Sequence, residues 1–149
     1  MSRDGYTTSP ADRAIAIVGV SCRLPGGITD LTTFWQALHD GADLIGDVPP
    51  DRFLTERFVD TSRPRPGKSY THAGGFLTDI AGFDAAHFGI SPKEAAQMDP
   101  QHRLLLELAA EALDDAAIAP DTLAGTDTAV HIGISDHSYG ALQMLMTDR

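Results

Sequence analysis

Residues 98–117, which read MDPQHRLLLELAAEALDDAA, set the architecture that we expect for this chain. Asp99 followed by Pro100 is typical of a helix start, because a carboxylate accepts a free backbone N–H there and proline has none to satisfy. The apolar side chains recur at helical spacing along one face: Leu104, Leu105, Leu108, Ala109, Ala112, Leu113 and Ala116. The sequence therefore predicts a helix from about residue 100 to Ala117, with small alanines that allow close packing.

Two other segments carry helix-start signals of the same kind. Asp30 precedes residues 31–40, LTTFWQALHD, whose apolar side chains fall at i, i+3, i+4 and i+7, and Gly41 then favours a helix end. Ser91 is followed by proline and, three positions after the serine, by Glu94, which together satisfy the free amides of a first turn. We predict a helix after each signal.

Two short apolar runs rich in β-branched residues predict the strands of a sheet. They are AIAIVGV at residues 14–20 and TAVHIGIS at residues 128–135. Continuous apolar runs of this length are typical of strands covered on both faces. Because helices and long connections separate the two runs, the sequence predicts an α/β fold with a parallel or mixed sheet.

The connections between these elements are less regular. Residues 48–68 are dense in proline, arginine and aspartate, which predicts a long surface excursion with a short helical turn near residues 51–58. The Gly74-Gly75 pair predicts extended chain that passes close to another backbone. The segment at 138–146 is apolar and predicts a last helix.

The composition is that of one globular domain. The chain has 149 residues, 42% hydrophobic and 21% charged, and residues 1–13 read as a polar leader before a domain at 14–149. The formal net charge of −10 argues against a nucleic-acid partner, because a phosphate backbone would be repelled. No apolar run of about 18 residues occurs, so we expect no membrane association and a cytoplasmic location. The single cysteine excludes an internal disulfide.

Cys22 follows the first predicted strand and admits two interpretations. As an activated thiol it would need a base that holds it as the thiolate, and no histidine lies close to it in the sequence. As a small apolar side chain it would pack inside the fold. We interpret Cys22 as structural.

Two further patterns are weak candidates for ligand sites. Gly19 and the Gly26-Gly27 pair follow a strand, but the spacing of dinucleotide-binding and Walker loops is absent, which favours a structural turn. His131 alternates with apolar residues in its predicted strand and so points away from a metal site with Asp136 and His137. The remaining isolated histidines receive no catalytic role: His72, His87 and His102. We predict no metal site and no directly bound cofactor.

The helix start at residue 99 also holds the densest pattern of polar residues. Asp99 is expected to act as the helix cap, and Arg103 lies one turn before Glu107, which predicts an i, i+4 ion pair. Residue chemistry alone therefore leads to an α/β domain without a visible active site.

Four stretches of the chain resemble the opening part of a β-ketoacyl synthase, specifically the ketosynthase domain of a type I modular or iterative polyketide synthase. They are AIAIVGVSCRLPGG at 14–27, FWQALHDGADLIGDVPPDRF at 34–53, residues 74–120, and TAVHIGISDHSY at 128–139. The motifs GGF, FDA, FGIS, MDPQ and RLLLE occur in that family's order and spacing. Five residues of these signatures are interpreted as structural: Asp99, Pro100, Gln101, Arg103 and Glu107.

The resemblance implies a thiolase-like fold, a layered αβαβα arrangement of two similar halves, of which this chain would be the opening portion. It also implies a decarboxylative Claisen condensation. In that reaction a cysteine thiolate accepts an acyl chain from the phosphopantetheine of an acyl carrier protein, and two histidines assist decarboxylation of a carrier-bound malonyl unit. The implied partners are the carrier, the remainder of the ketosynthase, the adjacent polyketide synthase domains and a second copy in a homodimer.

The family's catalytic residues, one cysteine and two histidines, are expected beyond Arg149. The resemblance places the nucleophile on an Asp-Thr-Ala-Cys-Ser type of signature that follows residues 128–135, and the two histidines further on. Cys22 belongs instead to the family's Cys-Arg-Phe-Pro-Gly-Gly stretch, which is structural. Three positions depart from common family residues: Leu24, His87 and Ala110.

Two other interpretations stay open from the sequence. One is a ketosynthase-like protein that binds a carrier or a partner protein without catalysis, and the other is a structural half that docks on a separately encoded remainder. Coding sequence past Arg149 would discriminate among the three. These residues do not specify the extender unit, the acyl chain or the product.

Overall fold

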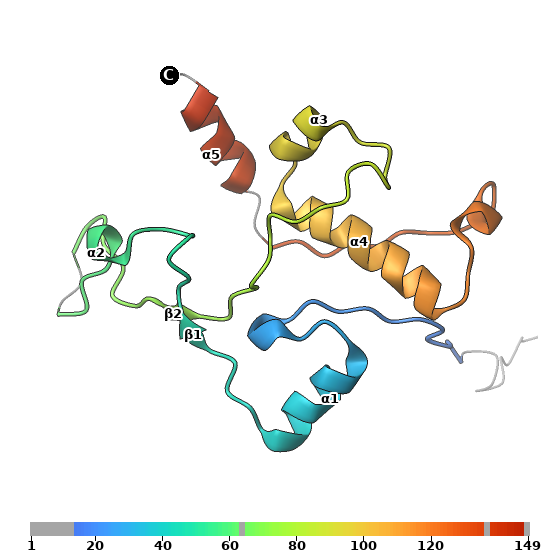
Figure 1. Cartoon of the computed structure of the whole chain (residues 1–149), viewed down its shortest axis with the longest axis horizontal. Coiled ribbons are helices and arrows are strands. Elements are labelled where there is room, and N and C mark those ends of the chain that lie inside the picture. Colours follow the sequence, from blue (N-terminus) through green and yellow to red (C-terminus); the bar gives the residue numbers. More distant parts are fainter. Residues whose placement is uncertain (1–13, 63–64, 136–137, 148–149) are drawn as a thin grey trace, which may run out of the picture.

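The computed structural model of the chain describes residues 14–62, 65–135 and 138–147. Helices dominate it: α1 at Leu31–Asp40, α2 at Thr55–Phe58, α3 at Pro92–Gln97, α4 at Pro100–Asp115 and α5 at Ser138–Thr147. Two 3₁₀ turns, η2 at Pro25–Gly27 and η3 at Pro120–Leu123, lie in the connections. Figure 1 shows α4 in the middle of the molecule, with α1 on one side and α2 at the tip of a long excursion.

The helix starts are those that the sequence predicts. The Asp30 carboxylate accepts the backbone N–H of Thr33 at 2.8 Å before α1, and the Ser91 hydroxyl accepts the N–H of Glu94 at 3.2 Å before α3. Gly41 ends α1 in the left-handed conformation, with φ of 61°. These contacts satisfy backbone groups that would otherwise lack a partner within the helix.

Helix α4 also begins as predicted but ends two residues earlier. The Asp99 carboxylate accepts the N–H of Gln101 at 2.9 Å. At the other end Ala117 has a φ of 54°, and this left-handed conformation is incompatible with continuation of the α-helix. The N–H of Ile118 then donates to the carbonyl of Leu113 at 2.9 Å and closes the end of the helix.

The two predicted strands at 14–20 and 128–135 are wrong for the described chain. Within the described residues the only ladder is a short antiparallel pair, β1 at Gly46–Asp47 and β2 at Ala73–Gly74. Segments 14–20 and 128–135 belong to no helix or strand there. A strand needs a neighbour for its N–H and C=O groups, and the described residues place none beside these two runs.

The predicted approach of two backbones near residues 74 and 75 is confirmed. Gly74 lies opposite Gly46 in the β1–β2 pair. A methyl group on Gly75 would come within 2.9 Å of the ring of Pro25, so glycine is required for this close packing. The helical turn expected near residues 51–58 is α2.

The core of the described chain is small. Its buried hydrophobic side chains are Ile28, Val48 and Ala95. The two apolar runs are largely exposed instead, with exposed fractions of 92% for Ile15 and 79% for Val130. None of the helices in the described part of the chain has the length and apolar character that a membrane crossing requires.

We predict that the chain by itself associates or has poor solubility, because β-branched side chains and unpaired backbone groups are exposed together along 14–20 and 128–135. Sedimentation velocity over a range of concentrations measures this directly. Ile17→Lys is expected to shift the distribution toward smaller species, whereas Ala96→Lys, at an exposed position of α3, is the matched control for added charge. A monodisperse monomer with a sharp thermal transition would contradict the prediction.

Candidate functional site

Residues 19–23 lie against α4 and are joined to it by polar contacts. The Ser21 hydroxyl donates to the carbonyl of Leu108 at 2.7 Å. The Arg23 guanidinium binds both carboxylate oxygens of Glu111, one of them at 2.8 Å. The pKa of Arg23 is raised, chiefly by this bond to Glu111. A bidentate pair of this kind fixes the relative orientation of the two segments as well as their distance.

A close backbone approach accompanies these contacts. A methyl group on Gly19 would lie 2.2 Å from the carbonyl oxygen of Ala112 and 2.8 Å from the side chain of Ala116. The next residue, Val20, donates its N–H to the Asp115 carboxylate at 2.9 Å. The small alanines of α4 therefore have the packing role that the sequence predicts, and Gly19 is a structural residue here.

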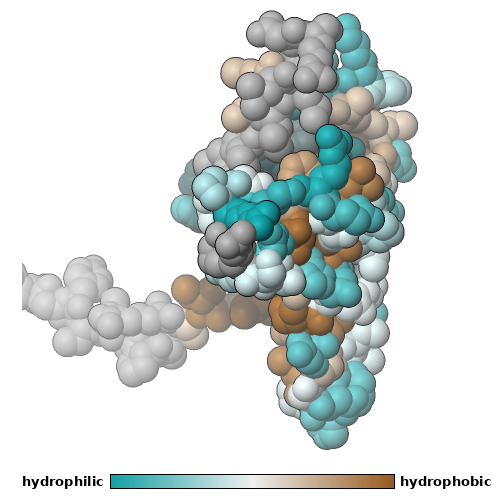
Figure 2. All heavy atoms as spheres, turned by 90° about the vertical axis from the view of Figure 1, so that its left-hand side faces the viewer, coloured by the Kyte–Doolittle hydropathy of each residue, from teal (hydrophilic) through white to brown (hydrophobic). Residues whose placement is uncertain are grey.

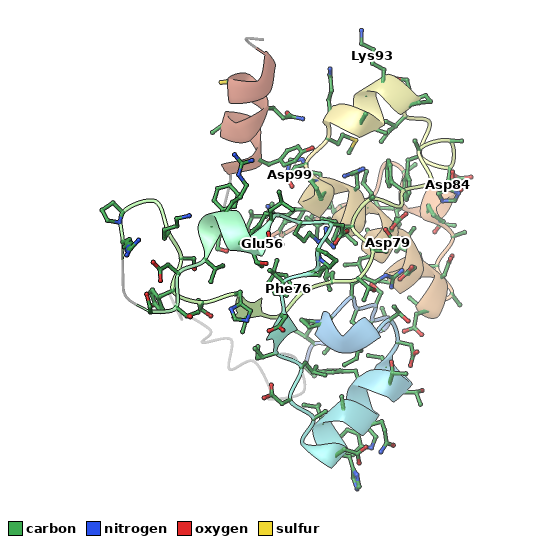
Figure 3. The ribbon with its side chains drawn as sticks, turned by 60° about the vertical axis from the view of Figure 1, so that its left-hand side comes forward. Glu56, Phe76, Asp79, Asp84, Lys93 and Asp99 are labelled. Atoms are coloured by element: carbon green, nitrogen blue, oxygen red, sulfur yellow. The ribbon has the colours of Figure 1, made fainter. Side chains whose placement is uncertain are left out.

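A loop at residues 79–84 covers the same side of α4 and is ordered by one carboxylate. Asp79 accepts the N–H groups of Gly82 at 2.9 Å and Ala81 at 3.1 Å. These two bonds, the one from Gly82 foremost, lower the pKa of Asp79 below its ordinary 3.8. Figure 3 shows Asp79 and Asp84 on this loop and Asp99 at the start of α4.

The predicted ion pair between Arg103 and Glu107 is wrong: the described residues contain no such pair. Arg103 instead donates to the carbonyl of Ala81 at 3.4 Å, and Glu107 accepts the N–H of Asp84 at 3.4 Å. The Nε of Arg103 is buried without a partner in the described structure. Both side chains therefore hold the 79–84 loop against α4. Helical spacing could not predict these contacts, because it relates only residues of the same helix.

A pocket of about 380 Å³ lies between these three segments. Its polar lining includes Arg23, Asp79 and Glu107, and its apolar lining comes from side chains of the same region: Leu24, Ile28, Leu77, Phe83 and Leu104. Among the described lining residues there is no thiol, imidazole or lysine. Arg23 binds the Glu111 carboxylate, and Asp79 and Glu107 accept backbone N–H groups. The arrangement therefore suits a structural joint rather than a nucleophile with its base.

The other predicted candidates are dispersed. Cys22 is a free, half-buried cysteine whose carbonyl accepts Nη1 of Arg23 at 3.0 Å. His72 lies 3.3 Å from Asp47, and His131 is exposed. The described residues contain no cluster of His, Cys, Asp and Glu that could hold a metal ion.

Three residues named in the sequence predictions lie outside the described part of the chain. Asp136 and His137 are two of them, so the structure does not place the metal trio that they would form with His131. The third is Arg149, beyond which the resemblance places the catalytic cysteine and the two histidines. The position of these catalytic residues therefore stays a prediction.

The remaining residues of the MDPQ signature lie at the start of α4. Pro100 takes the first helical position, where no N–H is needed. The Gln101 side chain approaches the second oxygen of Asp99 at 3.5 Å. Sequence reasoning missed the bond between Arg23 and Glu111, because these residues are 88 positions apart and neither carries a local signal for the other.

The comparisons with known proteins define the class to which this fold and these signatures belong. The family model for the β-ketoacyl synthase N-terminal domain matches residues 12–149. The chain belongs to this family, and its fold is the opening part of the thiolase-like fold.

Within that family its homologues are type I modular polyketide synthases. The chain is 50% identical over 135 residues to a phenolphthiocerol/phthiocerol polyketide synthase protein of Mycobacterium tuberculosis, and the match covers 89% of this chain and 7% of that protein. It is 50% identical over 126 residues to erythronolide synthase EryA2 of Saccharopolyspora erythraea, covering 84% and 4%.

Solved ketosynthase domains have the same fold. The ketosynthase from module 6 of the bacillaene synthase of Bacillus subtilis 168 matches with a TM-score of 0.72 and 34% identity, over 85% of this chain and 21% of that one. The oxazolomycin ketosynthase domain OzmH KS7 of Streptomyces albus matches with a TM-score of 0.68 and 39% identity, over 73% and 19%. The chain thus spans about a fifth of these domains and less than a tenth of the two synthases.

The lowered pKa of Asp79 makes the 79–84 loop sensitive to acid. A carboxyl whose folded-state pKa lies below its ordinary value of 3.8 stabilises the folded loop above that pH, and the contribution is lost as the pH falls through the folded-state pKa. We predict that hydrogen exchange at the Gly82 amide accelerates below pH 3.8 beyond its intrinsic pH dependence. NMR resolves the hydrogen-exchange rate of each backbone amide and so measures the rate at Gly82.

An internal control for this prediction comes from Asp30, whose pKa is lowered by the N–H of Thr33. The Asp79→Asn variant, which keeps an acceptor but cannot titrate, should remove the acid response at Gly82 and leave the response at Thr33. An unchanged response at Gly82 in this variant would mean that another group controls the loop.

Proposed function

We propose that this chain is the N-terminal portion of a polyketide synthase ketosynthase that catalyses decarboxylative Claisen condensation. The observation that carries the proposal is the match of residues 12–149 to the β-ketoacyl synthase N-terminal domain. The 50% identity to modular synthases from two genera supports polyketide rather than general acyl-transfer chemistry. No feature of the described residues favours a nucleic-acid or metal-dependent function.

In the proposed reaction a cysteine thiolate displaces the carrier thiol and takes the acyl chain as a thioester. Loss of CO₂ from a carrier-bound malonyl unit leaves a carbanion at the α-carbon. This carbanion attacks the acyl thioester, forms the new carbon–carbon bond and releases the thiolate. The two histidines assist the decarboxylation and, like the nucleophile, lie beyond Arg149 in the proposal.

The residues of this chain have a supporting part in the proposal. Residues 19–23 and the 79–84 loop are held on α4 through Glu111, Arg103 and Glu107, which supports a scaffold role for the signatures. Cys22 is half-buried beside Arg23, and we propose that it packs there rather than reacts. The α4 start at Asp99 is then a structural element of the ketosynthase.

The partners in the proposal follow from the same chemistry. Substrates arrive on the phosphopantetheine of an acyl carrier protein, so no cofactor is bound directly by this chain. In this proposal the remainder of the ketosynthase supplies the strand neighbours that 14–20 and 128–135 lack, and a homodimer with adjacent synthase domains forms the working enzyme. A cytoplasmic location belongs to the same proposal.

We predict that the 149-residue chain alone makes no β-ketoacyl product, because in this proposal the nucleophilic cysteine and the two assisting histidines lie beyond Arg149. Mass spectrometry after incubation with an acyl thioester and a malonyl-loaded carrier tests this. In the full-length synthase, Cys22→Ala should leave condensation unchanged. Loss of condensation in that variant at normal stability would make Cys22 the reacting thiol and contradict its structural role.

Substitutions at the start of α4 separate a structural from a functional role in the intact enzyme. Asp99→Ala is predicted to cost about 1 kcal/mol through the lost helix cap. Arg103→Ala is predicted to cost on the order of 1 kcal/mol, because the Ala81 carbonyl loses its donor. Both variants should melt earlier and recover condensation at low temperature, as thermal scans and turnover measurements will report.

Lys93→Ala, on an exposed position of α3, is the control for removal of a basic side chain near this region. It should change neither melting nor condensation. Normal melting of Arg103→Ala together with crippled condensation would move the start of α4 from the scaffold into the functional site.

A further inference from the structure

Gln143 on α5 makes a contact that is separate from the joint on α4. Its side-chain amide donates to the backbone carbonyl of Gln97 at 2.7 Å, although the two residues are 46 positions apart in the sequence. Gln97 is the last residue of α3, and the last four carbonyls of a helix have no N–H partner within that helix. The Gln143 amide therefore supplies a donor to the C-terminal end of α3 from another helix.

The carbonyl that accepts this bond belongs to a tight corner between two helices. Only Met98 and Asp99 separate α3 from α4. The N–H of Met98 donates to the carbonyl of Glu94 at 3.0 Å, and the Asp99 carboxylate caps α4. The bond to Gln97 thus ties α5 to the corner at which α4 begins, and both Figure 1 and Figure 3 show α5 beside this corner.

At this contact the polar side chain of α5 is turned inward and its apolar neighbour is turned outward. Gln143 is half-buried, whereas Met144 is 77% exposed. Exposed hydrophobic residues lie beside hydrophilic ones on the side of the molecule that Figure 2 faces, so an exposed apolar side chain alone carries little information. A half-buried amide is informative, because it needs hydrogen-bond partners where it leaves water.

We propose that Gln143 is a positioning residue for the condensation, because its bond to Gln97 sets the direction in which the chain leaves α5. This inference rests on the proposed function, in which the chain continues past Arg149 to the nucleophilic cysteine. A helix that is held near its middle on a fixed corner passes its orientation to the residues that follow it. A small displacement of a reacting group lowers the rate even when the changed residue lies far from the chemistry.

The test uses the full-length synthase and two replacements of similar length and helix propensity. Gln143→Met removes the donor, whereas Gln143→Lys supplies another donor, which suits the carbonyl end of a helix. We expect Gln143→Met to lower the kcat of condensation about tenfold and to leave the KM for the malonyl-loaded carrier within about twofold. Gln143→Lys should recover most of this loss.

Met144→Gln is the matched control, because it places an amide one position away at an exposed site of the same helix. It should change neither kcat nor KM. Hydrogen exchange of the α5 backbone amides, followed by mass spectrometry, measures the attachment of α5 without reference to catalysis. Exchange should accelerate in Gln143→Met and stay at the parent rate in Gln143→Lys and Met144→Gln.

The outcomes separate this inference from the proposed function. A parent synthase that forms no β-ketoacyl product would contradict the proposed function and the inference together. Parent-like kcat in Gln143→Met would overturn the inference and leave the proposed function intact, as would unchanged hydrogen exchange in α5. Lower kcat that Gln143→Lys does not recover, or that returns to the parent value at low temperature after an earlier melting transition, would make Gln143 structural only and the inference wrong.

Discussion

Arg23 and Glu111 are 88 positions apart in the chain, and the bidentate pair between guanidinium and carboxylate fixes where the N-terminal part of the fold lies on α4. With side chains 25% and 41% exposed, such a pair contributes only about 1 kcal/mol. Its importance is geometric, because the close approach of Gly19 to Ala112 leaves no room for a side chain at this position. The ion pair and the close contact at Gly19 together fix the position of residues 19–23 along α4.

The polar residues of the family signatures have structural roles in this arrangement. Asp99 caps α4, while Arg103 and Glu107 hold the 79–84 loop, which Asp79 orders internally. Polar residues gathered around one pocket resemble an active site at first sight. Here each acidic or guanidinium group faces a backbone or ionic partner, so they form a joint between segments of a ketosynthase scaffold.

Apolar side chains are exposed in two places, along the runs at 14–20 and 128–135 and on the excursion that carries α2. The runs at 14–20 and 128–135 are apolar and without strand neighbours in the described chain, and this chain covers 21% of the bacillaene ketosynthase it resembles. The excursion that carries α2 is different, because it is internally hydrogen-bonded and its apolar surface is aromatic with basic residues around it. Both surfaces are exposed in a chain that covers about a fifth of the solved ketosynthase domains.

The sequence by itself determined the helices, since caps at Asp30, Ser91 and Asp99 act within one turn and local spacing reveals them. It also determined the family, through motifs that keep their order. Tertiary structure alone decided whether residues 14–20 pair as a strand, because a ladder needs partners that local sequence does not contain. It also decided that Arg103 reaches Ala81 rather than Glu107 and that Arg23 meets Glu111, because such choices depend on which distant segment the fold brings within hydrogen-bonding distance.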